Sequence, residues 1–263
     1  MNADLEFALS LADDADAISL SRFRARDLRV ETKPDGTPVS EADRAVEERL
    51  RERIAAERPG ERVLGEELGA DGGEGERWIL DPIDATKNYV RGIPLFATLI
   101  ALEERVAVVS APALGRRWWA VRGEGAWSGD RRLRVSHVGR LEDAVLTYTS
   151  LRGWDGRFHA LAARAWAARG FGDFWQYMLL AEGAVDVCVE IEANLWDLAA
   201  PKLIVEEAGG RLTDLTGAHR ADGRDRHRVG APRAGSPGAG ARKAVRAPQD
   251  GRPQRCSVSP RQS

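Results

Sequence analysis

The sequence of 263 residues has no long apolar run, few cysteines and no excess of positive charge. Its longest apolar runs fall far short of the roughly 18 to 20 residues that a membrane span needs, so no membrane association is expected. Cys188 and Cys256 are its two cysteines, and their different settings argue against a disulfide framework or a cysteine metal site. A formal charge of −2 gives no whole-chain reason to expect nucleic acid.

The N-terminal residues lack the pattern of an export signal. Met1 to Glu6 are acidic where a secretory signal would be basic and then apolar, so a cytoplasmic protein is expected. The four histidines are scattered, which favours surface or packing roles over a histidine metal site.

The C-terminal residues differ in composition from the rest. Residues 223–263 contain ten Lys or Arg against two Asp, five prolines and no Leu, Ile, Phe, Trp or Met. Such a segment cannot bury enough apolar surface to offset its ordering entropy, so residues 222–263 are predicted to form a disordered basic tail. It is either a natural tail that attracts polyanions by charge or, as we prefer, the product of a frameshift. No aromatic residue interleaves with its arginines, so specific nucleic-acid binding is not expected.

The first half of the sequence predicts two helices followed by strands. Apolar residues at helical spacing predict helices over 4–24 and 41–56, with a turn-rich stretch over 33–38 and Ser40 as a helix cap. Short apolar runs then predict a mainly antiparallel set of strands. These strands are expected at 62–65, 78–80, 97–102, 106–111, 118–122 and 133–136.

The pattern changes after about residue 143. Strands and helices now alternate, which is typical of an α/β lobe. The expected order is strand 144–149, helix 157–168, helix 174–182, strand 185–190 and helix 195–208. We therefore predict an N-terminal lobe over 1–140 and a smaller C-terminal lobe over 141–221, which lacks its last elements if the tail is disordered.

The most informative residues are carboxylates at the ends of apolar elements. Asp81 and Asp84 follow a strand, Glu66 ends the preceding strand, and Asp197 lies in the first turn of an apolar helix. Each could be only a cap or a strand end. If the four converge, their repulsion requires cations, and hard divalent ions with oxygen ligands are the usual remedy, so magnesium is expected.

Two long motifs give a resemblance to a known family. WILDPIDATKNYV resembles the D-P-[ILF]-D-G-T motif of the inositol monophosphatase family, and WDLAAPKLIVEEAGG resembles its second signature. GEE at 65–67 and VSEAD at 39–43 occur in the expected order, and the resemblance covers about 4–217. Within the family, KNYVRGIPLFATLIAL, GDFWQYM and EGAVDVCVE are most similar to histidinol-phosphate phosphatases of the actinobacterial type. The resemblance implies a layered αβαβα sandwich.

The resemblance also implies a set of metal ligands. One ion would be bound by Glu66, Asp81 and the backbone carbonyl of Ile83, and a second by Asp81, Asp84 and Asp197. A third, looser ion would bind near Glu66. Two ions so placed activate a water and stabilise the leaving oxygen in a displacement at phosphorus.

Catalytic and phosphate-binding residues follow from the same resemblance. Thr86 and Asp43, together with Glu66, would orient and deprotonate the attacking water, although Asp43 also fits a capping box that begins at Ser40. The backbone amides of Ala85 and Thr86 would bind phosphate. The family has glycine where this chain has Ala85, so a reduced rate is expected if this residue needs positive φ.

The remaining candidates concern the substrate. Lys33 aligns with a family lysine near the phosphate, and Asp173 and Glu190 match positions that reach the alcohol part of the substrate. Two carboxylates suit a cationic amino alcohol such as histidinol.

The implied function is Mg²⁺-dependent hydrolysis of a small phosphate monoester, L-histidinol phosphate, in histidine biosynthesis. An inositol-1-phosphate or sugar phosphatase is the alternative within this class, and a catalytically impaired paralogue that binds metal and phosphate is the alternative outside it. A homodimer is the family habit.

Overall fold

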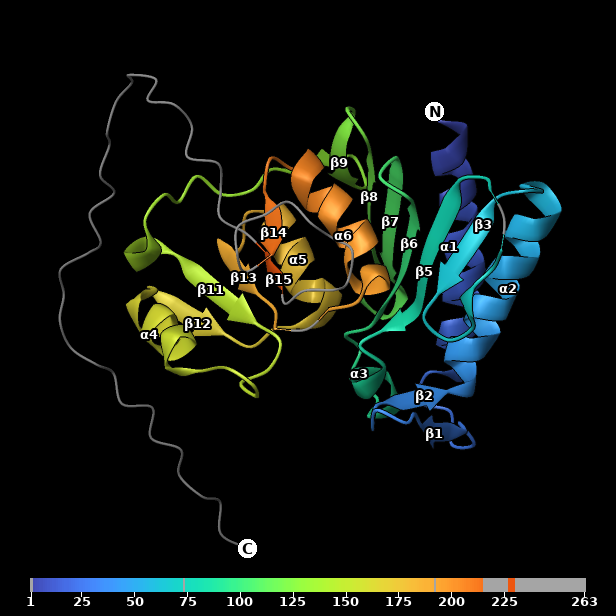
Figure 1. Cartoon of the computed structure of the whole chain (residues 1–263), viewed down its shortest axis with the longest axis horizontal. Helices are drawn as coiled ribbons and strands as arrows, with labels where there is room; N and C mark the ends of the chain where they lie inside the picture. The colour runs from blue at the N-terminus through green and yellow to red at the C-terminus, as the bar shows by residue number, and fades with distance from the viewer. Residues whose placement is uncertain (1, 73, 192, 215–226, 230–263) are drawn as a thin grey trace, which may run out of the picture. The chain divides into compact units, whose positions relative to one another are not determined.

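Two capped helices begin the fold and confirm the predicted pair. The computed structural model describes residues 2–72, 74–191, 193–214 and 227–229. Helix α1 (Ala3–Arg22) begins where the Asn2 side chain accepts hydrogen bonds from two backbone N–H groups. Helix α2 (Glu41–Glu57) begins at the Ser40 capping box. Their apolar residues pack on one face of a large sheet, and Figure 1 shows both helices on the same side of this sheet.

This large sheet has eight strands and is mainly antiparallel, as predicted. The pair β3 and β5 is parallel, because it is the pair joined by a crossover rather than a hairpin. In sheet order the strands are β10 (Arg131–Arg132), β9 (Gly125–Ser128), β8 (Arg116–Val121), β7 (Val106–Ala111), β6 (Ala97–Leu102), β5 (Arg77–Asp84), β3 (Arg62–Gly65) and β4 (Gly69–Ala70).

The opposite face of the large sheet is covered by α5 (Asp173–Ala181) and α6 (Leu195–Glu207). Alternate residues of the central strands serve the two faces: Leu80 and Ile100 pack toward α1 and α2, whereas Ile79 and Leu99 pack toward α5 and α6. The strands are therefore buried on both sides.

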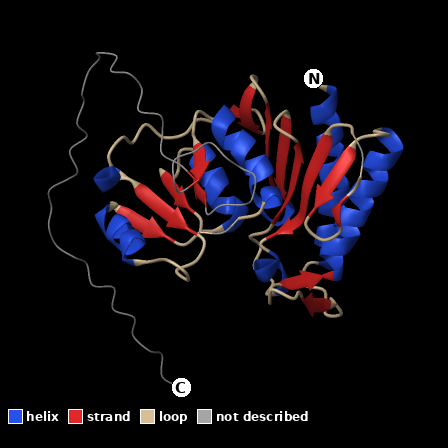
Figure 2. Cartoon of the chain, viewed as in Figure 1, coloured by secondary structure: helices blue, strands red, loops and turns tan. Residues whose placement is uncertain are grey.

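A second sheet of five strands lies on the other side of α5 and α6. Its outer face is covered by α4 (Gly156–Arg164), so the layers follow the predicted αβαβα order (Figure 2). In sheet order the strands are β12 (Ala167–Arg169), β11 (Val145–Tyr148), β13 (Val187–Val189), β15 (His227–Val229) and β14 (Leu212–Asp214).

Short elements complete the described residues. The predicted turn over 33–38 closes an antiparallel hairpin of two strands, and one helical turn follows β5. The elements are β1 (Val30–Thr32), β2 (Pro38–Ser40), α3 (Thr86–Val90), and the 3-10 helices η1 (Pro112–Leu114) and η2 (Leu141–Asp143). No helix among the described residues is long and apolar enough to cross a membrane.

One predicted strand is wrong, and one predicted helix is confirmed but ends earlier than predicted. Residues 133–136 form no strand; Leu133 N–H donates to Ala126 O and Val135 N–H to Ala208 O, so the chain leaves the sheet while its apolar residues still reach the core. The helix predicted over 157–168 ends at Arg164, and β12 follows. Alanine favours helix, but pairing with β11 decides the conformation of residues 167–169.

One short segment of the predicted tail, residues 227–229, forms a strand. β15 lies between β13 and β14 and is antiparallel to both, so the sheet has a strand after β14. A central strand of three residues needs backbone hydrogen bonds to two neighbours more than it needs large apolar side chains, which is why composition missed it. Residues 222–226 and 230–263 of the predicted tail lie outside the described residues.

Candidate functional site

A bulge at the end of β5 turns Asp81 and Asp84 toward one place. Side chains three positions apart in a regular strand point to opposite faces, but the pairing of β5 with β6 shifts register between Asp81 and Asp84. Pro82 lacks an N–H, and its carbonyl accepts a hydrogen bond from Thr98 Oγ1 at 2.8 Å. The Asp84 carboxylate accepts the N–H of Phe174 at 2.5 Å, which ties it to the start of α5.

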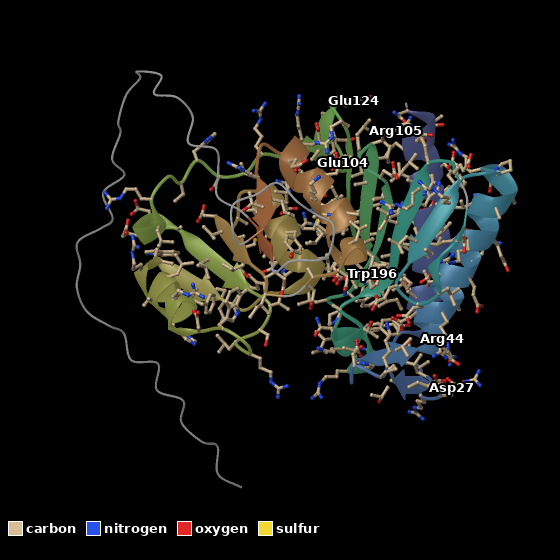
Figure 3. The ribbon with its side chains drawn as sticks, in the orientation of Figure 1. Asp27, Arg44, Glu104, Arg105, Glu124 and Trp196 are labelled. Carbon is tan, nitrogen blue, oxygen red and sulfur yellow. The ribbon has the colours of Figure 1, made fainter. Side chains whose placement is uncertain are left out.

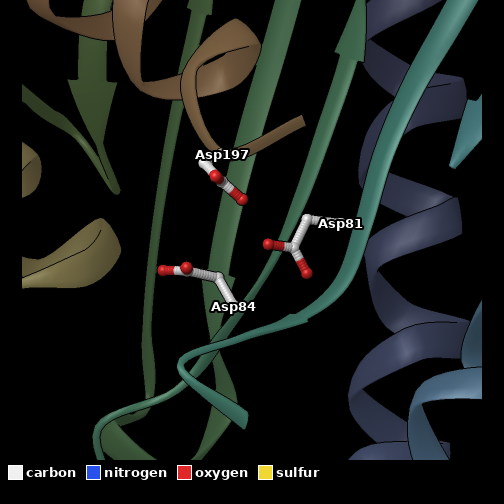
Figure 4. Close-up of side chains that lie close together, drawn as sticks. All are labelled: Asp81, Asp84 and Asp197. Atoms are coloured by element: carbon white, nitrogen blue, oxygen red, sulfur yellow. The ribbon is translucent and has the colours of Figure 1, made fainter. Parts of the chain in front are cut away.

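Asp197 joins these residues from the start of α6. Its Oδ2 accepts the backbone N–H of Asn194 at 2.6 Å, which makes it a helix cap as well. One carboxylate oxygen from each of Asp81, Asp84 and Asp197 lies within 4.8 Å of the others. Figure 4 shows the three side chains gathered between β5 and α6.

The pKa values of these carboxyls reflect burial together with mutual repulsion. Burial first, and then the charges of Glu66 and Asp84, raise the pKa of Asp81 well above its ordinary value. Burial and the charge of Asp173 do the same for Asp84. Burial raises the pKa of Asp197 to about 7, although the Asn194 N–H opposes the shift. The cluster is therefore costly to ionise unless a cation binds.

Asp81 provides a test of whether a metal ion fits this cluster. Both of its carboxylate oxygens are buried, and neither has a hydrogen-bond partner among the described residues. A buried carboxylate without a partner is strongly unfavourable, and hard divalent cations prefer ligands of this kind. The residues present fit a divalent metal ion.

Glu66 approaches from the turn between β3 and β4. It lines the same cavity of about 600 Å³ as the three aspartates, but it lies outside the group whose oxygens are within 4.8 Å. Its carboxylate accepts a hydrogen bond from Lys33 Nζ at 2.8 Å, and Lys33 also bonds to Glu67 at 2.7 Å. Lys33 is therefore paired with acids on this turn, and it is not among the residues that line the cavity.

The two carboxylate oxygens of Asp43 accept hydrogen bonds from two different residues. Oδ2 accepts hydrogen bonds from the Ser40 N–H at 2.8 Å and from Ser40 Oγ at 2.6 Å, which completes the capping box of α2. Oδ1 accepts a hydrogen bond from Thr86 Oγ1 at 3.0 Å, and Thr86 Oγ1 lies 2.9 Å from Ile83 O. Burial raises the pKa of Asp43, while the bonds from Ser40 and Thr86 oppose the rise. The capping and site interpretations of Asp43 are thus geometrically compatible.

Ala85 has a left-handed backbone conformation, which is the condition under which a reduced rate is expected. Its φ is 67° and its ψ 43°, immediately before α3. A side chain in this region costs about 1 to 2 kcal/mol because Cβ approaches the following carbonyl oxygen. Asp173, at φ 47°, is a second strained residue beside the cavity.

The five-stranded sheet and α5 supply a further polar group. Asp173 lines the cavity, but Glu190 does not; it is buried behind Thr149, which does. The Glu190 carboxylate accepts hydrogen bonds from Thr149 Oγ1 and, at 2.9 Å, from Gln176 Nε2. Burial raises the pKa of Glu190 to about 8. Burial also raises the pKa of Asp173, and the charge of Lys87 opposes the shift.

Sequence reasoning missed several residues that line the cavity. Asp35 and Thr37 come from the turn between β1 and β2, where Thr37 Oγ1 and N–H both bond to Asp35. Lys87 is a cation of α3 at the cavity, and its place directly after Thr86 could have identified it. Trp196, which precedes Asp197 and is labelled in Figure 3, does not line the cavity; its buried indole N–H has no partner among the described residues.

Known proteins with similar sequences bear directly on this site. The profile of the inositol monophosphatase family matches residues 2–247, which extends past residue 217 into the predicted tail. The histidinol-phosphatase of Streptomyces coelicolor is 53% identical over 232 residues, covering 81% of this chain and 87% of its own. That of Mycobacterium tuberculosis is 52% identical over 229 residues, covering 81% and 88%.

Solved structures agree with these sequence matches. The extragenic suppressor protein SuhB of Bartonella henselae is 30% identical, with a TM-score of 0.81 over 88% of this chain and 95% of its own. The IMPase of Thermotoga maritima is also 30% identical, with a TM-score of 0.80 over 88% and 92%. From its sequence matches and its layered fold, the chain belongs to the inositol monophosphatase family.

Proposed function

We propose that this protein is a Mg²⁺-dependent phosphoric monoester hydrolase whose substrate is L-histidinol phosphate. The observation that carries the proposal is the convergence of Asp81, Asp84 and Asp197 in one cavity, where both oxygens of Asp81 lack a partner among the described residues. The substrate follows from the histidinol-phosphatases that share about half of their residues with this chain.

The metal ligands would be Glu66, Asp81, Asp84, Asp197 and the carbonyl of Ile83. They would hold two ions, with a looser third near Glu66. When bound, Mg²⁺ supplies activation of water and stabilisation of negative charge at phosphorus and the leaving oxygen.

Asp43 and Thr86 would handle the proton of the attacking water. Thr86 Oγ1 already bonds to Asp43, so a water that donates to Thr86 can pass its proton toward the carboxylate. The raised pKa of the buried Asp43 makes it a stronger base than an exposed aspartate. Glu66, beside the same cavity, would assist in placing this water.

Phosphate would bind at the start of α3, on the backbone amides of Ala85 and Thr86. Free N–H groups in the first turn of a helix favour an anion, and both residues line the cavity. Lys33 would add positive charge from the neighbouring turn once it separates from Glu66.

The alcohol part of the substrate would face Asp173, with Glu190 behind Thr149. Histidinol carries an ammonium group, and a carboxylate attracts it more strongly where water is partly excluded. Inositol, which is uncharged, would gain less from the same groups.

A panel of phosphomonoesters tests the proposal. Release of phosphate from L-histidinol phosphate, inositol 1-phosphate and sugar phosphates is measured with Mg²⁺ and again with excess chelator. We expect the highest kcat/KM on L-histidinol phosphate and loss of turnover with chelator. Equal turnover of inositol 1-phosphate would refute the substrate, and turnover that survives chelation would refute the metal dependence. Magnesium and phosphate binding without any hydrolysis would identify an impaired paralogue.

We further infer a cytoplasmic homodimer with lobes over 1–140 and 141–221. Light scattering on the purified protein tests the dimer, since a monomer mass would contradict it. Limited proteolysis tests the lobes, and cleavage near residue 140 is expected.

A further inference from the structure

The Glu47 side chain forms hydrogen bonds to the backbone of the turn that carries Glu66. The proposed mechanism gives this carboxylate no role. Glu47 belongs to α2 and is 0% exposed. Its Oε2 accepts the N–H of Glu67 at 2.7 Å, and its Oε1 accepts the N–H of Leu68 at 3.1 Å. These are the two residues that directly follow Glu66.

Arg51 completes this support one helical turn later. It pairs with Glu47 at 2.8 Å, which neutralises the buried charge. It also donates to the carbonyl of Gly69 and to Asp71 at 2.6 Å, on the far side of the same turn. Side chains of α2 therefore hold the β3–β4 turn at both its N–H and its C=O groups.

Gly65 shows how closely Glu47 approaches. A Cβ at residue 65 would lie 1.9 Å from Glu47 Oε1, so any side chain there would displace the carboxylate. A glycine is needed immediately before Glu66 because the Glu47 side chain occupies the space beside it.

Asp43 lies four residues before Glu47, which places both on one face of α2. Asp43 contacts Thr86, whereas Glu47 contacts the turn that carries Glu66. One helix thus contacts two parts of the site, the α3 residue Thr86 after β5 and the turn after β3.

We propose that Glu47 is a positioning residue that sets Glu66 for metal binding, with Gly65 providing the room for it. The inference rests on the proposed metal-dependent function. Residues that orient a metal ligand typically change metal affinity by about 10- to 100-fold when they are lost.

The test measures Mg²⁺ binding by calorimetry on the full chain without substrate, alongside kcat and KM at saturating Mg²⁺. Glu47→Gln keeps the shape but removes one acceptor, and we expect Mg²⁺ binding to weaken about 10-fold or more, with a smaller change in kcat. Gly65→Ala adds a Cβ that would displace the Glu47 carboxylate, so it should weaken Mg²⁺ binding similarly. In the Glu47→Ala background, the effect of Gly65→Ala should shrink.

Glu57→Gln is the matched control, because Glu57 pairs with Arg53 on the same helix without touching the turn. Unchanged Mg²⁺ binding in Glu47→Gln, or equal losses in Glu57→Gln, would overturn the inference while leaving the proposed function intact. Failure of both Glu47→Gln and Gly65→Ala to fold would make Glu47 a determinant of the fold instead. A wild-type protein that binds no Mg²⁺ would refute the proposed function and the inference together.

Discussion

The large sheet and the five-stranded sheet contribute to the cavity in different ways. β5 has eight residues, is buried on both faces and ends at Asp84, and its bulge and the α3 turn fix the groups assigned to the reaction. The strands of the smaller sheet have three or four residues, and Thr149 and Glu190, which directly follow β11 and β13, form a hydrogen-bonded cluster with Gln176 of α5. The first region fixes the positions of Asp81 and Asp84, whereas the second holds Glu190 behind Thr149 at the wall of the cavity.

Phe174, in α5 between the two sheets, donates its N–H to the Asp84 carboxylate at the end of β5. We propose that the residues at the end of β5 carry out the reaction, and that substrate choice depends on Asp173 of α5 and on Glu190, which directly follows β13. Substitutions in the first region should lower kcat, and those in the second should change KM for particular esters.

The largest effect is expected at Asp81 in the large-sheet region. Asp81→Asn removes the carboxylate whose oxygens lack partners, and kcat/KM should fall by about 10³-fold or more, since several kcal/mol of charge stabilisation are lost. In chelator the same variant should melt at a higher temperature than the wild type, because a buried like charge is gone. Phosphate release and thermal melting check both; retained activity would refute a metal role for Asp81.

The next largest effect is expected for Thr86→Ala. This substitution separates a catalytic role of the Thr86–Asp43 contact from helix capping by Asp43. It removes the hydroxyl that bonds to Asp43 but leaves the Ser40 capping box intact. We expect kcat to fall about 10²-fold with little change in KM or melting temperature. Ser40→Ala is the control, with a stability loss of about 1 kcal/mol from the cap. Equal kcat losses in the two variants would point to a structural role.

Glu190 gives a pH-dependent effect in the smaller-sheet region. Burial raises its pKa to about 8 in the folded protein, against 4.5 ordinarily. The folded state therefore holds a proton that the unfolded chain releases, so this residue's contribution to the free energy of unfolding falls as pH rises from 4.5 to 8. Relative to the wild type, Glu190→Gln should gain a few kcal/mol of stability over this range. Denaturant unfolding in chelator checks the trend; a constant difference would contradict it.

The same substitution should also change KM for a cationic substrate. Above pH 8, where Glu190 is ionised, Glu190→Gln should raise KM for L-histidinol phosphate about tenfold, because a carboxylate near a cationic substrate is lost. KM for an uncharged sugar phosphate should change little, and kcat for both should stay close to wild type. A loss of kcat for every ester would instead make Glu190 part of the reacting region.

The smallest effect is expected at Ala85. Ala85→Gly relieves the left-handed strain and opens the space beside the phosphate, so kcat/KM should rise a few-fold. Stability should change by less than about 1 kcal/mol, since glycine also makes the unfolded chain more flexible. An unchanged kcat/KM would show that backbone approach at residue 85 does not limit turnover.

Much of the fold could be predicted because its signals are local. Capping at Ser40 and apolar periodicity over 41–56 identified α2, and continuous apolar runs identified β6 and β7 to the residue. Residues 133–136, 167–169 and 227–229 could not be predicted, because their conformations depend on which distant backbone groups they meet.

The same distinction between local signals and distant contacts applies to the candidate site. The sequence alone determined which carboxylates stand at the ends of apolar elements, because strand and helix endings are encoded within a few neighbouring residues. The tertiary structure was needed to show that Asp81, Asp84 and Asp197 lie close together. It was also needed to show that Glu190 lies behind the cavity wall and that Glu47 contacts the turn that carries Glu66. Those outcomes depend on a register shift, on layer packing and on hydrogen bonds between residues distant in sequence, and a local pattern contains none of these.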